Sequence, residues 1–215
     1  MFIYIIIMDE HTKYILLIMG FVILGYFYAT EYVYNVGSEH YKDNDIVLAD
    51  IGFTMVSDKR DSEELYKMKE LAHILYLILF IYMSCDNKHA LAEFAISCAI
   101  VLLTKNVLFA STILPDPSQK CEKFKLSKAH NGSCHDLVIS THCTLSIISF
   151  YTIIRHGIGG NIFAWFSGSY NLWLIYSILS LRQHYTMDIL NAIIYGFFVN
   201  NYVSNKISKL DNATP

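Results

Sequence analysis

Two histidines with nearby carboxylates stand at the polar ends of apolar segments. His184 and Asp188 are four residues apart in RQHYTMDIL, and His142 follows Asp136 in DLVISTHCT. Residues at i and i+4 of a helix share a face. The Asp188 carboxylate can therefore hold the proton of one imidazole nitrogen and leave the other nitrogen free as a nucleophile or base. The alternative interpretation is a buried histidine–aspartate pair that only fixes two helices.

The composition indicates the kind of scaffold that must position these groups. Of 215 residues, 54% are hydrophobic and 16% are charged. The net charge of −3 gives no indication of a nucleic-acid partner. A membrane crossing needs roughly 20 apolar residues. The sequence offers six such segments, at residues 14–36, 70–85, 90–113, 138–155, 162–181 and 186–203.

We therefore predict an all-α fold, a polytopic membrane protein built as a six-transmembrane-helix bundle. It would form one domain over residues 1–215, with a catalytic core at about 90–203. The alternative is a soluble, all-helical domain with buried helices. Two spans lie between His142 and His184, so the chain leaves one side of the membrane and returns to it. Both histidine motifs are thus expected on the same side.

The distribution of charge does not determine which side of the membrane the two histidine motifs face. Lysine and arginine residues are more numerous on the motif side, which by the positive-inside rule would face the cytosol. Much of that basic charge sits in one long loop that also carries acidic residues. The charge pattern alone therefore leaves the orientation open.

The cysteines do not form a CxxC pair, and neither metal nor another cofactor is predicted. Cys85, Cys98 and Cys143 fall in or beside apolar segments, so we predict that their thiols lie in the core. Cys121 and Cys134 share one polar loop and could pair in an oxidising compartment.

A zinc site has few candidate ligands in the sequence. The histidines and cysteines near the first motif lack a standard zinc spacing; they are His130, Cys134, His135, His142 and Cys143.

Four stretches together resemble the sphingomyelin synthase family. CHDLVISTHCT is similar to its C-G-D-x-x-x-S-G-H-T stretch, and HYTMDILNA resembles its H-Y-T-x-D-x-x-x-A stretch. KNVLFASTILPDPSQKC is similar to its segment with a basic residue, T-x-L-P-x-P and a cysteine, and LADIGF resembles L-P-D-x-G. The resemblance runs in order from about Leu48 to Asn200.

The resemblance implies six-span enzymes of the lipid phosphatase and phosphotransferase superfamily, with reactive histidines at the exoplasmic leaflet. By resemblance, the chain would move a phosphorylated head group, phosphocholine by default, from a glycerophospholipid such as phosphatidylcholine to ceramide, releasing diacylglycerol. His184 would form a phospho-histidine intermediate, Asp188 would orient it, and His142 would be the acid/base. The compartment would be the Golgi or the plasma membrane. A homo-oligomer is compatible with the sequence.

Supporting residues follow from the same resemblance. Lys105 and Arg182 would neutralise phosphate oxygens, and Asp136 would support one histidine. Ser140 would assist at the first motif. Tyr185, Trp165 or Trp173 could cradle a quaternary ammonium group by cation–π contact, or such aromatic residues could form belts at the membrane interface and pack in the core. Equally open is that Lys105 is a snorkelling lysine and that Arg182 anchors a helix end.

The chain departs from the family pattern at four positions. Thr141 and His135 each stand where the family has glycine, Cys143 stands for threonine, and Lys105 stands for arginine. Lysine is a point charge rather than a planar fork, so it would hold phosphate less rigidly.

Two other functions remain open from the sequence. A lipid phosphate phosphatase would use the same histidines with water as acceptor. Its signature has a further basic run before S-G-H and an arginine upstream of the last histidine. SLRQH offers only Arg182, two residues before His184. A membrane transport or scaffold protein would keep the fold without catalysis.

Overall fold

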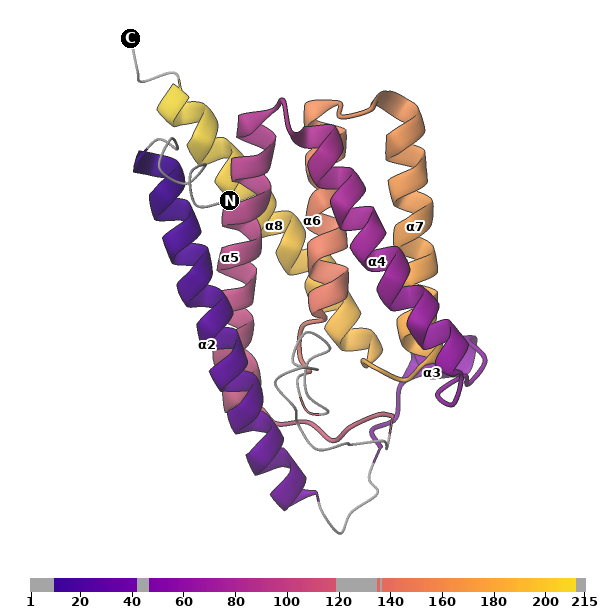
Figure 1. The fold of residues 1–215 in the computed structure, drawn as a ribbon. Coiled ribbons are helices and arrows are strands. Elements are labelled where there is room, and N and C mark those ends of the chain that lie inside the picture. The colour runs from indigo at the N-terminus through magenta and orange to yellow at the C-terminus, as the bar shows by residue number, and fades with distance from the viewer. Residues whose placement is uncertain (1–9, 42–46, 119–134, 136, 212–215) are drawn as a thin grey trace.

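The computed structural model describes residues 10–41, 47–118, 135 and 137–211. All regular structure in these residues is helical (Figure 1). The helices are α2 (Glu10–His40), α3 (Ile51–Met55), α4 (Glu63–Ser84), α5 (Lys88–Ser111), α6 (Thr141–His156), α7 (Gly160–Ser180) and α8 (Thr186–Asp211).

The six long helices coincide with the six predicted spans, and only the short helix α3 was not predicted. Two of them, Lys88–Leu108 of α5 and Gly160–Ser180 of α7, are long and apolar enough to cross a membrane. Helix α6 has only 16 residues, fewer than the roughly 20 that a crossing needs. The all-helical class is confirmed for the described residues, and six crossings remain a prediction.

The outer faces of the long helices carry many exposed large apolar side chains. Examples are Phe21 (68% exposed), Ile162 (87%) and Phe198 (64%) on three different helices. So many exposed large apolar side chains on several helices of one small bundle are unusual for a soluble monomer. The surface therefore favours association with lipid.

Local signals in the sequence set the helix boundaries near the motifs. Ser62, Asn87 and Ser140 are the N-caps of α4, α5 and α6, and each side chain accepts a hydrogen bond from a backbone N–H three residues on. Helix α6 ends at Gly157, whose φ of 63° is the left-handed conformation that glycine adopts without steric cost. Capping fixes where α6 starts, one residue after Ser140.

The helices run so that both histidine motifs come to one end of the bundle. At that end α4, α6 and α8 begin and α7 ends, and α3 contacts α7 and α8 (Figure 1). The α4–α5 and α6–α7 turns lie at the other end, where α2 begins and α8 ends. The prediction that the two motifs share a side of the bundle agrees with this arrangement.

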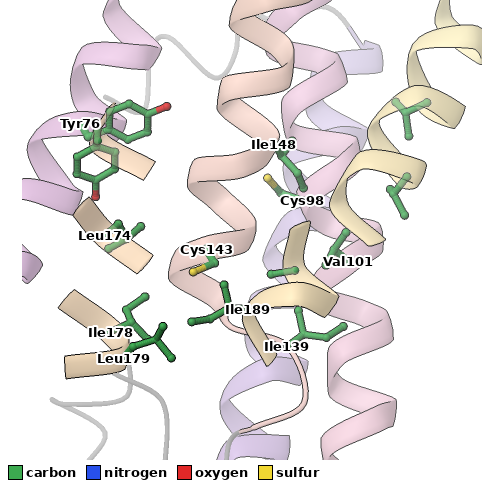
Figure 2. Close-up of a cluster of buried hydrophobic side chains, with 14 residues drawn as sticks. Tyr76, Cys98, Val101, Ile139, Cys143, Ile148, Leu174, Ile178, Leu179 and Ile189 are labelled. Atoms are coloured by element: carbon green, nitrogen blue, oxygen red, sulfur yellow. The ribbon is translucent and has the colours of Figure 1, made fainter. Parts of the chain in front are cut away.

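A buried apolar cluster beside the motifs contains residues from each of the helices α4, α5, α6, α7 and α8 (Figure 2). Cys98 and Cys143 lie in it, as predicted, beside Ile148 and Leu174. Cys85 was expected in the core but is exposed, because it follows the last residue of α4. Cys121 and Cys134, and with them the disulfide prediction, lie outside the described residues.

Candidate active site

The predicted pair at the start of α8 is formed. His184 Nδ1 lies 3.1 Å from Asp188 Oδ2, and the Asp188 residue is 1% exposed. Asp188 Oδ2 also accepts from the Tyr185 backbone N–H at 3.1 Å. A carboxylate at this place fixes the Nδ1–H tautomer of His184 and leaves Nε2 with its lone pair.

Asp188 also connects α8 to the first motif. Its Oδ1 accepts from the Val138 N–H at 2.9 Å, and its carbonyl oxygen accepts from the Ser140 N–H at 3.2 Å. Val138 has φ of 79°, an unfavourable conformation for a β-branched residue. Its carbonyl oxygen accepts from Asn191 Nδ2 at 2.9 Å, so α8 holds this strained residue from both sides. Such strain is typical of functional sites.

His142 has a carboxylate partner that the sequence analysis missed. Its Nε2 lies 3.3 Å from Glu70 Oε2 of α4. Glu70 Oε1 forms an ion pair with Lys69 Nζ at 2.5 Å, and Lys69 also donates to Gln183 Oε1 at 2.7 Å. Lys69 is fully buried. The chain Gln183–Lys69–Glu70–His142 thus connects the residue before His184 to the second histidine.

A third imidazole lies against the site. The His73 and His142 rings are 4.9 Å apart, and His73 Nδ1 shares a 2.9 Å hydrogen bond with the Tyr170 hydroxyl. His73 is 5% exposed, and its Nε2 has no hydrogen-bond partner in the described part of the chain. The sequence signal for these residues is the spacing of Lys69 and Glu70 from His73, four and three residues, at the point where the apolar run of α4 begins.

Lys105 reaches the site from α5. Its Nζ donates to Thr141 Oγ1 at 2.5 Å and lies 5.4 Å from the centre of the Tyr26 ring. The residue is 1% exposed, so it does not extend to an interface as a snorkelling lysine would. This arrangement brings a buried cation to the first turn of α6, next to His142.

Arg182 lies at the other side of the site and is 8% exposed. Its guanidinium stacks over the Phe53 ring at 4.1 Å, and its Nη2 donates to the Phe53 carbonyl oxygen at 3.1 Å. Its Nη1 is buried without a hydrogen-bond partner among the described residues. A buried N–H group of a cation that lacks an acceptor is costly, and an anionic ligand would satisfy it.

A loop carboxylate completes the surroundings of Arg182. Asp58 Oδ2 is 3.7 Å from Arg182 Nε. The hydrogen bond from the Arg60 side chain lowers the pKa of Asp58 to about 2. Asp58 is therefore ionised at neutral pH and holds one edge of the guanidinium.

The LADIGF stretch has a structural function that its sequence did not reveal. Asp50 is the N-cap of α3, and its carboxylate also accepts from the Thr186 N–H at 2.6 Å and from Thr186 Oγ1 at 2.5 Å. A Cβ on Gly52 would lie 2.0 Å from Thr186 Oγ1. The aspartate and the glycine thus dock α3 against the start of α8.

Tyr185 is a supporting residue rather than an open aromatic surface. It is 4% exposed, and its hydroxyl donates to the Pro115 carbonyl oxygen at 3.0 Å and accepts from the Leu48 N–H at 3.3 Å. Trp165 is 79% exposed and lies near the beginning of α7, at the end of the bundle away from the motifs. The suggestion that it cradles a head group is therefore wrong.

His135 is accommodated by a glycine on α2. A Cβ on Gly37 would lie 2.4 Å from the His135 ring, which also stacks on Tyr41 at 5.5 Å. His135 Nδ1 shares a 2.8 Å hydrogen bond with the Leu114 carbonyl oxygen. The imidazole that stands in place of a family glycine is thus a buried packing residue.

Some predictions fall outside the described residues, namely the function of Asp136 and the parts of the zinc alternative that involve His130 and Cys134. Within residues that the structure describes, no group of three or more histidine, cysteine or acidic side chains is placed to hold a metal ion.

The geometry connects two histidine–carboxylate pairs, His184–Asp188 and His142–Glu70, at one end of a helical bundle. Residues 133–206 match a family model described as PAP2 superfamily C-terminal. This segment includes His142, His184 and Asp188. The match supports the lipid phosphatase and phosphotransferase superfamily for this segment, and with it a phosphoryl-transfer activity on lipid-like substrates. A search of curated proteins finds no match.

Proposed function

We propose that the protein is a sphingolipid synthase that transfers a phosphorylated head group from a glycerophospholipid to ceramide. The observation that carries the proposal is the pairing of each histidine with its own carboxylate, which differentiates their functions. His184 Nδ1 faces Asp188 and His142 Nε2 faces Glu70, so a different ring nitrogen is free in each. A two-step transfer needs one nucleophile and one acid/base group.

In the first step, His184 Nε2 forms a bond to phosphorus as the bond from phosphorus to the diacylglycerol oxygen breaks. His142 Nδ1 gives a proton to that departing oxygen. In the second step, the ceramide hydroxyl oxygen attacks phosphorus, its proton passes to His142 Nδ1, and the bond from phosphorus to His184 Nε2 breaks. The Asp188 carboxylate stabilises the positive charge on His184.

The surroundings favour the phosphate of a lipid head group. Lys105, Lys69 and Arg182 bring three buried cations to this end of the bundle, and the buried Arg182 Nη1 lacks a protein acceptor among described residues. The helices α6 and α8 both begin here, and helix N-termini favour anions. Lipid tails would lie against the apolar helix faces while the phosphate reaches the helix ends.

The test is purified protein given labelled ceramide and phosphatidylcholine, with His184→Ala as control. Labelled sphingomyelin that disappears in the control supports the proposal. Release of phosphocholine without labelled sphingolipid would instead indicate hydrolysis with water as acceptor. Release of inorganic phosphate from phosphatidic acid in a parallel assay would indicate a lipid phosphate phosphatase. The donor survey includes phospholipids with ethanolamine and inositol head groups. If none of the donors gives a product, the alternative of a non-catalytic membrane protein is favoured.

A further inference from the structure

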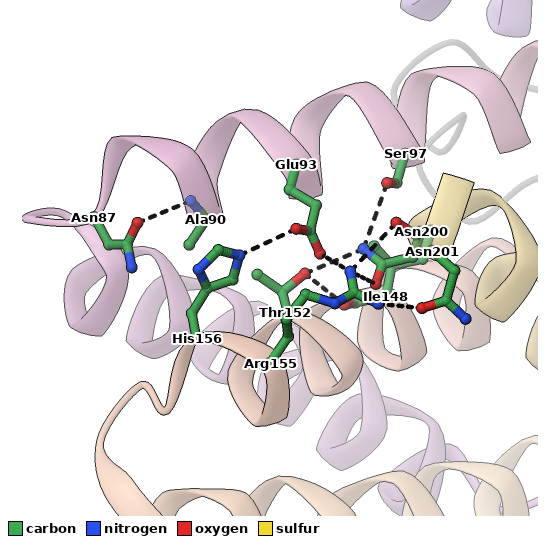
Figure 3. Close-up of polar contacts among 10 residues, drawn as sticks. All are labelled: Asn87, Ala90, Glu93, Ser97, Ile148, Thr152, Arg155, His156, Asn200 and Asn201. Atoms are coloured by element: carbon green, nitrogen blue, oxygen red, sulfur yellow. Dashed lines mark hydrogen bonds and ion pairs between the residues drawn. The ribbon is translucent and has the colours of Figure 1, made fainter. Parts of the chain in front are cut away.

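A second buried polar cluster lies at the end of the bundle away from the histidine motifs, between α5, α6 and α8 (Figure 3). Glu93 of α5 is 2% exposed. Its Oε2 accepts from His156 Nε2 at 3.0 Å, and its Oε1 accepts from Arg155 Nη1. The carboxylate thus joins α5 to the last turn of α6.

Helix α8 enters the same cluster through two asparagines. Arg155 Nη1 donates to Asn200 Oδ1 at 2.8 Å, and Arg155 Nη2 donates to Asn201 Oδ1. Asn200 Nδ2 donates to Ser97 Oγ of α5 and to Thr152 Oγ1 of α6, each at 3.4 Å. Asn200, Ser97 and Thr152 are fully buried. One network therefore joins all three helices.

These three helices also carry the candidate active site at their opposite ends. Lys105 of α5 contacts Thr141 of α6, and Asp188 of α8 accepts from the Ser140 N–H at the start of α6. Each helix is a continuous rod between the two ends, so an axial displacement at Glu93 is transmitted to the site.

Stability alone explains the cluster poorly. In the Glu93–Arg155 pair the carboxylate is buried, while the Arg155 side chain is 28% exposed. Desolvation of the buried carboxylate offsets much of the attraction between the charges, so the pair contributes little to stability. A buried polar network at a helix contact can instead select one register, since a shift of one residue moves a helix by about 1.5 Å and separates the partners. Misplacement of a reacting group by about 1 Å can lower a rate about 10²-fold.

We propose that Glu93, together with Arg155 and Asn200, acts as a positioning group that fixes the register of α5, α6 and α8 and so aligns Lys105, His142 and Asp188. The kinetic part of this inference rests on the proposed function. Its structural part concerns the hydrogen bonds from residues 138 and 140 to Asp188 and does not depend on which reaction is catalysed.

The experiment compares wild type with Glu93→Gln, with the apolar double variant Glu93→Leu plus Arg155→Met, and with Asp86→Asn. The last removes an exposed carboxylate at the same end of the bundle as a matched control. The measurements are kcat and KM for head-group transfer, the thermal unfolding temperature, and amide hydrogen exchange in segment 137–141. All variants are studied as the full chain in detergent or lipid.

Glu93→Gln is expected to lower kcat about tenfold or more with KM within about twofold, and to speed exchange in segment 137–141 about tenfold. The double variant should unfold at or above the temperature of Glu93→Gln and yet share both defects. Amide exchange and turnover at wild-type levels in the double variant would overturn the proposal. A loss of kcat that is fully explained by a smaller fraction of folded protein would overturn it as well. If wild type transfers no head group, the proposed function fails, and the exchange result alone decides the register claim.

Discussion

Lys105 Nζ donates a hydrogen bond to Thr141 Oγ1 at 2.5 Å. Both residues depart from the sphingomyelin synthase pattern, which has arginine and glycine at these positions. A longer, planar guanidinium beside a glycine is thus replaced by a shorter ammonium beside a hydroxyl. Because Lys105 is 1% exposed, the two positions occupy one buried space and should vary together.

Substitution of Lys105 and Thr141 by the arginine and glycine of the family pattern should have strongly non-additive effects on kcat/KM. Lys105→Arg alone must fit a larger side chain beside Thr141, and Thr141→Gly alone removes the acceptor of a buried cation and weakens the start of α6. We expect each single variant to lower kcat/KM at least about tenfold and the double variant to recover most of that loss, a coupling of about 0.5–3 kcal/mol. A double-mutant cycle measures the coupling, and losses that simply multiply would contradict the paired arrangement.

Gly37→Ala should destabilise the protein although alanine favours helices by about 1 kcal/mol over glycine. The new methyl would lie 2.4 Å from the His135 ring, and overpacking of this kind costs about 1–3 kcal/mol. Thermal unfolding measures the effect. Gly20→Ala is the matched control on the same helix, because no atom lies within 4 Å of the added Cβ. Recovery of stability when His135→Gly is added would attribute the effect to this contact, and a lack of recovery would argue against it.

Gly52→Ala should impair activity more than it impairs folding. Its Cβ would lie 2.0 Å from Thr186 Oγ1, so α3 must move away from the start of α8, next to His184. We expect turnover to fall about tenfold or more, with a small change in unfolding temperature because α3 has only five residues. Addition of Thr186→Ala removes the obstructing hydroxyl and should restore part of the activity. Unchanged turnover in Gly52→Ala would show that α3 does not position α8.

Asp188→Asn should lower turnover about 10²–10⁴-fold with little change in phospholipid KM. The amide keeps the shape of the carboxylate, but its NH₂ group would face a backbone N–H of Val138 or Tyr185, and the tautomer of His184 would no longer be fixed. Steady-state kinetics check this, with circular dichroism as the folding control. Turnover within about threefold of wild type would favour the alternative of a merely structural histidine–aspartate pair.

The sequence predicted the elements whose signals are local. Long apolar segments located the six long helices, and the even number of segments between the motifs predicted that they share an end of the bundle. The four-residue spacing predicted the contact of His184 with Asp188. These signals depend only on helix periodicity and length, so one sequence is sufficient for them.

Contacts between distant segments were not predictable in the same way. Asp50 caps α8 across 136 residues of sequence, and Glu70 contacts His142 across 72. Lys69 and Glu70 lie at the boundary of a predicted span, and ionisable residues at such a place in an apolar segment indicate a site. The same reasoning applies to Glu93, whose partners Arg155 and His156 on α6 are defined only by the packing.

Detection of a covalent intermediate on His184 would be the most direct test of the proposed mechanism. Purified protein is given phosphatidylcholine with a labelled head group in the absence of ceramide, stopped at alkaline pH, and digested for mass spectrometry. The account predicts a phosphocholine adduct on the imidazole of His184 that ceramide discharges to labelled sphingomyelin and that is absent in His184→Ala. An adduct on His142 instead, or labelled sphingomyelin formed at the wild-type rate by His184→Ala, would contradict it.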